Sequence, residues 1–140
     1  MKSLLRNILA LPLGLAVGSV VNMSLILAGP AVIPPPPGVD VTSAESMAAS
    51  MHLFEPRHFL FPFLAHALGT LAGAFVAFLA AASHRLVFGW IVVAVSLAGG
   101  IAASFMIPAP KWFVALDLVA AYIPMGWIAI RLGARIGGPT

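Results

Sequence analysis

The stretch Phe59–Gly73, FLFPFLAHALGTLAG, decides how this chain folds. It is apolar apart from His66 and Thr70, and it lies inside a longer hydrophobic run. In an α-helix, side chains three, four and seven positions apart share one face, so the imidazole of His66 lies beside Gly69, Thr70 and Gly73. Small residues on such a face let a second helix approach closely in lipid. The His66 side chain is therefore expected to face protein and not lipid.

The composition around this stretch is typical of a membrane protein. Of the 140 residues, 61% are hydrophobic and 8% are charged, which is far from the balance of soluble domains. A bilayer core of about 30 Å needs about 20 helical residues per crossing, so the length accommodates four spans and no separate soluble domain. Cysteine is absent, which excludes disulfides and thiolate chemistry. The net charge of +3 comes from a few residues at helix ends, so the expected partner is the lipid bilayer and not a nucleic acid.

Four hydrophobic runs predict four transmembrane helices, at residues 5–28, 58–82, 86–107 and 112–132. Within the fourth run, Pro124 removes one backbone donor and frees the carbonyl of Ala120. Two of the other runs carry small residues at four-residue intervals, a pattern that favours close helix packing. These residues are Gly14, Gly18 and Asn22 in the first run, and Ser96, Gly100 and Ser104 in the third.

An outer loop, residues 30–56, connects the first two predicted spans. Its run of prolines at 34–37 predicts a stiff spacer. Beyond it, Thr42 and Glu45 have the spacing of a capping box. We therefore expect a short amphipathic helix at residues 43–52, lying on the membrane surface.

The distribution of basic residues predicts the topology. Five of them gather at one end of the predicted helices, Lys2, Arg6, Arg85, Arg131 and Arg135, against Arg57 and Lys111 at the other. The positive-inside rule then puts both termini in the cytoplasm. Short connections make sequence neighbours antiparallel. The predicted fold is an all-α integral membrane protein, a single domain over residues 1–140 that forms an antiparallel four-transmembrane-helix bundle.

Three polar residues of three helices are predicted to lie at one depth. At about 1.5 Å rise per residue, Asn22, His66 and Asp117 each lie about 9 to 12 Å below the outer end of their helices. An ionised Asp inside a span costs about 2.5–3.5 kcal/mol unless it finds a partner. His66 is the expected partner of Asp117, and Asn22 is expected to satisfy the remaining hydrogen bonds.

The outer loop carries further polar residues above this level, Glu55, Arg57 and His58, which we include as binding residues of an outward-facing pocket. Each group also has a structural alternative. The membrane-embedded His, Asp and Asn can serve as interhelical hydrogen-bonding groups alone, and the loop residues can interact with water or lipid headgroups. Imidazole and carboxylate suit zinc, manganese or iron, but the sequence contains no stronger metal motif. Metal binding stays open and no cofactor is expected.

Two segments carry a family resemblance. IPPPPGVDVTSAESMAASMHLFEPRHFLFPFLAHALGTLAGAFVA (residues 33–77) and WFVALDLVAAYIPMGWIA (residues 112–129) resemble an uncharacterised family of small bacterial membrane proteins with four predicted helices. The resemblance implies a multi-pass protein of the bacterial inner membrane. It further implies that the loop, His66 and Asp117 belong to the family pattern, and it implies no activity.

Two functional hypotheses follow. In the first, the chain is a homo-oligomeric transport or channel-type protein whose His66–Asp117 pair handles a proton or small cation, with the glycine-lined faces of the first and third helices in contact between subunits. In the second, it is an accessory or assembly subunit that docks a membrane protein partner or lipid through its outer loop. A membrane enzyme acting on a lipid or quinone ranks third, so enzymatic activity stays open but is not the favoured expectation.

Overall fold

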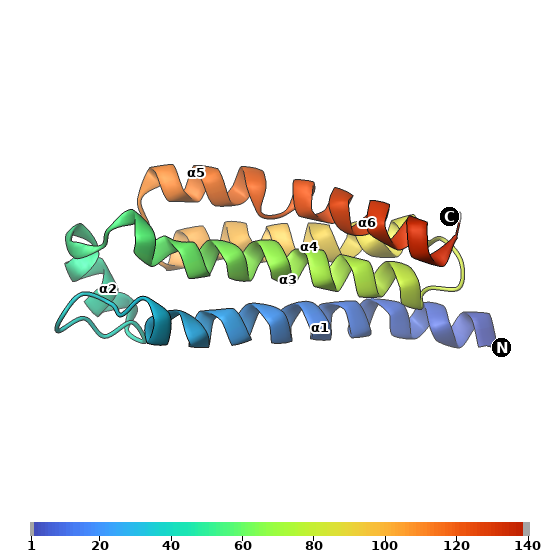
Figure 1. The fold of residues 1–140 in the computed structure, drawn as a ribbon, viewed down its shortest axis with the longest axis horizontal. Coiled ribbons are helices and arrows are strands. Elements are labelled where there is room, and N and C mark those ends of the chain that lie inside the picture. The colour runs from blue at the N-terminus through green and yellow to red at the C-terminus, as the bar shows by residue number, and fades with distance from the viewer. Residues whose placement is uncertain (1, 139–140) are drawn as a thin grey trace.

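In a computed structural model, which describes residues 2–138, every regular element of that range is a helix. The long helices run along one common direction (Figure 1). Both chain ends lie at one end of this bundle and α2 lies at the other. The elements are α1 (Lys2–Val32), α2 (Ala44–Ser50), two 3-10 turns (Met51–Leu53 and Pro56–Phe59), α3 (Leu60–Ala80), α4 (Arg85–Met106), α5 (Lys111–Ala120) and α6 (Ile123–Gly137).

Four helical stretches of this range are long and apolar enough to cross a membrane. The first, α1, is longer at both ends than the predicted span 5–28. It ends at Val32, directly before Ile33. Ile33 precedes Pro34, and a residue before proline is disfavoured in the α region. The second and third, α3 and α4, differ from the predicted bounds by one or two residues at each end.

The predicted fourth span, 112–132, consists of two helices. α5 ends at Ala120 and α6 begins at Ile123, with Pro124 in its first turn. Because Pro124 has no N–H, it cannot continue the hydrogen-bonded ladder of α5. The proline that was expected to free one carbonyl inside a single helix instead accompanies a complete break.

The predicted surface helix, 43–52, is shorter in the structure. Its N-cap is Ser43, whose hydroxyl accepts a hydrogen bond from the Ser46 N–H at 3.2 Å, so the predicted capping box beginning at Thr42 is wrong. Thr42 is engaged elsewhere, because its hydroxyl and its N–H both donate to Asp40 Oδ1. The helix proper ends at Ser50 and a 3-10 turn follows.

α3 is the central helix and packs against α1, α4 and α6. Glycines form its seam with α1: a Cβ added at Gly18 would lie 2.8 Å from the Gly69 carbonyl oxygen, and one added at Gly73 would lie 2.8 Å from that of Gly14. The two backbones are thus in direct contact. The glycine face of α1, which was expected to contact another subunit, instead packs against α3 of the same chain.

Polar side chains fix the end of the bundle that holds the termini. The Arg6 guanidinium donates to the carbonyls of Leu79, Ala80 and Ala81, which the C-terminal end of α3 leaves without intrahelical donors. Asn7 accepts from the N–H of Ala82 at 2.8 Å. Arg6, predicted only as a topology signal, therefore also caps α3.

Candidate functional site

The structure brings His66 of α3 and Asp117 of α5 into direct contact. His66 Nδ1 lies 2.9 Å from both carboxylate oxygens of Asp117. The Asp117 side chain is 6% exposed and that of His66 is 23% exposed. When Asp117 is ionised, its carboxylate only accepts hydrogen bonds, and Nδ1 is then the donor of this pair. The structure therefore contains the contact that was expected between His66 and Asp117.

Tyr122 completes the cluster, a residue that the sequence reasoning did not include. Its hydroxyl donates to Asp117 Oδ2 at 3.2 Å, and its ring stacks on the His66 imidazole with centroids 5.9 Å apart and planes at 27°. Tyr122 is 2% exposed. Two features of the sequence could have pointed to it: it is the single tyrosine of the chain, and it lies two residues before Pro124. His66, Asp117 and Tyr122 are called the polar triad below.

The break between α5 and α6 makes this triad geometrically possible. An α-helix turns about 100° per residue, so in a continuous helix Tyr122 and Asp117 would point about 140° apart. Tyr122 instead has φ −115° and ψ −73°, outside the helical ladder. Its hydroxyl returns onto Asp117 and fills the space beside Gly100, where a side chain would overlap it. The Gly100 face of α4, expected between subunits, is therefore also used within the chain.

Two cavities meet at the triad. The loop-side cavity, about 300 Å³, lies beneath the outer loop between α1, α3, α4 and α5, and reaches His66 and Asp117. The groove cavity, about 400 Å³, lies between α1, α3 and α4 and is lined by Asn22, Thr70, Ser96 and Tyr122, among others. His66 lines both cavities. The imidazole thus stands at the boundary between the two spaces.

The second ring nitrogen of His66, Nε2, is available to a ligand. It forms no hydrogen bond with any residue in the described part of the chain. Within that part, no fully buried side-chain nitrogen or oxygen lacks a partner. Since Nε2 has no partner, it retains accessible surface, and the ring that carries it lines both cavities. With Nδ1 protonated toward Asp117, a neutral imidazole presents the Nε2 lone pair there.

Asn22 does not join the triad. It lines the groove cavity and its Cβ packs close to Gly69. Over residues 2–138 it forms no hydrogen bond with His66 or Asp117, and Tyr122 takes the role that was expected of it. Tyr122 follows Asp117 by five residues, and its long side chain carries the hydroxyl to the carboxylate. Asn22 lies on another helix, α1.

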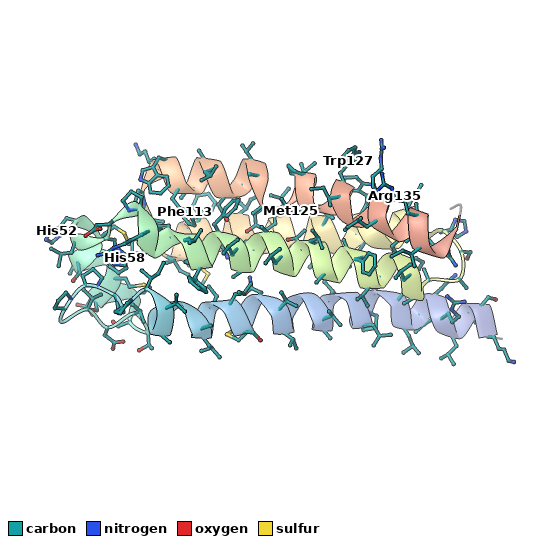
Figure 2. All side chains as sticks on the ribbon, in the orientation of Figure 1. His52, His58, Phe113, Met125, Trp127 and Arg135 are labelled. Atoms are coloured by element: carbon teal, nitrogen blue, oxygen red, sulfur yellow. The ribbon has the colours of Figure 1, made fainter. Side chains whose placement is uncertain are left out.

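The loop residues separate into two groups. Glu55 and Arg57 pair with each other at 3.0 Å, with side chains 60% and 64% exposed, and they lie outside both cavities. His58 lines the loop-side cavity, and its Nδ1 accepts a hydrogen bond from the Glu55 N–H at 2.9 Å. His58 and Phe113 lie toward the α2 end of the bundle (Figure 2).

The ligand set is sparse for a metal. Among residues 2–138, no three His, Asp or Glu side chains come together in a group that could hold an ion. His66 and Asp117 supply two ligands, fewer than the three or four protein ligands of zinc sites. The chemistry that this arrangement supports is hydrogen bonding and proton exchange.

Comparison with known proteins gives no family. No family model matches the chain, and no match was found among curated proteins or solved structures. The functional conclusion therefore depends on the polar triad and the two cavities.

Proposed function

We propose that the four apolar helical stretches span the bacterial inner membrane as an antiparallel bundle, with both termini cytoplasmic. Their length and hydropathy support this, as do large apolar side chains that point outward, such as Leu27, Val119 and Ile136. Charge supports the orientation, because more basic residues lie at the end with the termini. In this orientation the loop-side cavity faces outward.

We further propose that the chain is a small transport protein that exchanges a proton with its cargo at His66. The observation that carries this is the position of the imidazole: Nδ1 is held by Asp117, Nε2 is free, and the ring lines two cavities that lie along the bundle. The broken fourth span adds support, since transporters commonly form their sites where transmembrane helices are discontinuous.

The chemical step is proton uptake and release at Nε2. A proton accepted there converts His66 to an imidazolium, whose charge the Asp117 carboxylate balances at 2.9 Å. The Tyr122 hydroxyl keeps the carboxylate oriented during both states. A proton suits the site better than a metal cation, because one carboxylate that already accepts two hydrogen bonds is a poor replacement for a hydration shell.

Proton flux into proteoliposomes that contain a pH-sensitive dye tests this function. Asp117→Asn and His66→Gln are expected to abolish the flux, since the first removes the balancing charge and the second removes the titrating ring. His52→Gln is the matched control, because His52 is exposed on the loop and lies outside both cavities. Unchanged flux in both triad variants would rule out proton exchange at His66.

The alternative of an accessory subunit has less structural support. Its docking surface was expected on the outer loop, whose apolar residues include Met47 and Met51. Both methionines line the loop-side cavity and are half-buried. They are thus better placed to contact a ligand inside the bundle than a partner outside it.

A further inference from the structure

We propose that the loop-side cavity binds a small hydroxylated aromatic molecule, of the phenol or quinol class, whose hydroxyl donates a hydrogen bond to His66 Nε2. This inference rests on the proposed function, because it names the cargo of the same site. Three features of the cavity lead to it: its lining, its polar groups and its size.

The lining favours an aromatic ring. Phe54, Phe59, Phe61 and Phe113 all contribute to it. Phe59 is buried, and its ring centroid lies 4.8 Å from that of Phe113 at a tilt of 38°. Aromatic rings pack on one another in such offset and tilted arrangements. A ligand ring extends an aromatic cluster that the chain has already formed.

The polar groups favour one hydrogen-bond donor on that ring. Ser104 donates its hydroxyl to the Ile101 carbonyl at 2.7 Å, and the Asp117 carboxylate already accepts from His66 and Tyr122. His66 lines the inner end of the cavity beside Asp117, and its Nε2 is an acceptor without a partner in the described part of the chain. His58 also lines the cavity, toward the loop end (Figure 2). Its Nδ1 accepts from the Glu55 N–H, so the neutral ring carries its proton on Nε2 and offers no free acceptor there. A ligand with its donor at one end and an apolar body matches this arrangement.

The size favours a small molecule. About 300 Å³ is at the lower limit of the range of about 300–1,000 Å³ that ligand pockets occupy. One ring with a short alkyl tail fits this volume, whereas a two-chain phospholipid does not. The apolar lining also disfavours a hydrated ion, which would lose its water without replacement.

The test uses para-pentylphenol as the probe and the full chain in lipid nanodiscs. Protein labelled with ¹⁵N-histidine is titrated, and the Nε2 resonance of His66 is assigned by its loss in His66→Asn. We expect a saturable shift of that resonance. The methyl ether, para-pentylanisole, has no donor and is expected to bind about fivefold to tenfold more weakly. The saturated ring of pentylcyclohexanol tests the aromatic requirement and is also expected to bind more weakly.

Variants locate the contact. His66→Asn retains a polar group toward Asp117 but leaves nothing at the Nε2 position, so it is expected to lose about the same factor in affinity as the methyl ether, measured by ligand-observed NMR. His52→Gln is expected to bind as the natural chain does. Absence of a saturable shift, or equal binding of the phenol and its ether to the natural chain, would overturn the inference without relying on any variant.

The outcome is separable from that of the proposed function. Proton flux that depends on His66, together with no response to the phenol, would overturn the ligand class and leave proton exchange standing. Saturable phenol binding without proton flux would support the ligand class and would contradict transport.

Discussion

Gly14 lies in the seam between α1 and α3, and its replacement by alanine tests that seam. A Cβ at this position would lie 2.7 Å from the Ala77 Cβ and 2.7 Å from the Gly73 carbonyl oxygen. Ordinary contacts between such atoms are about 3.5–4.0 Å. Neither neighbour is the end of a flexible side chain, so the two helices must separate by about 1 Å.

Gly99 provides the matched control for this substitution. It lies on α4, and a Cβ there would meet nothing within 4 Å. Alanine gains about 0.8–1.0 kcal/mol over glycine in a helix interior, and this gain applies to both variants. Overpacking costs about 1–3 kcal/mol and applies to Gly14→Ala alone. The difference between the two variants is therefore expected to be about 1–3 kcal/mol, with Gly14→Ala the less stable.

The assay is reversible unfolding in mixed micelles of dodecyl maltoside and increasing dodecyl sulfate, followed by far-UV circular dichroism. We expect Gly99→Ala to unfold at the same detergent fraction as the natural chain or at a higher one. Gly14→Ala is expected to unfold at a lower fraction than Gly99→Ala. Equal stability of the two variants would refute the close approach of α1 to α3.

Two further predictions concern hydrogen bonds. Tyr122→Phe removes the donor to Asp117 Oδ2 and is expected to lower the free energy of unfolding by about 0.6–1.7 kcal/mol; unchanged stability would exclude this bond. The Thr42 hydroxyl and then its N–H hold the pKa of the Asp40 carboxyl below its ordinary value, so carboxyl ¹³C NMR is expected to show that pKa rising in Thr42→Val and remaining low in Thr42→Ser. The stabilisation from this contact is present above the ordinary pKa and is lost as the pH falls through the lowered one; a pKa that does not respond to Thr42→Val would contradict the assignment.

The helices were predictable because apolar runs and glycine spacing determine them locally. Phe59–Gly73 showed which face of α3 admits another helix, and the structure puts α1 on Gly69 and Gly73 of that face. The pattern did not indicate whether the helix packed on this face belongs to the same chain or to another subunit. Small residues indicate that another helix packs closely, and the same sequence pattern fits a helix of the same chain or of a second subunit.

The candidate site was half predictable. Helical rise put His66 and Asp117 at one depth, and their contact follows from the mutual need of a carboxylate and an imidazole in an apolar region. Tyr122 could not be placed by the same reasoning, because a regular helix points it away from Asp117. Its position depends on the break before Pro124, and a proline does not by itself distinguish a kink from a break.

The protonation of the two His66 ring nitrogens is the most direct test of the central claim, which is proton exchange at Nε2 with Nδ1 fixed by Asp117. It is measured by ¹⁵N NMR of histidine-labelled protein in lipid nanodiscs, from alkaline to acidic pH. We predict that Nδ1 remains protonated throughout and that Nε2 changes from unprotonated to protonated as the pH falls. Protonation of Nε2 at every pH with an unprotonated Nδ1, or no change at either nitrogen, would contradict the account.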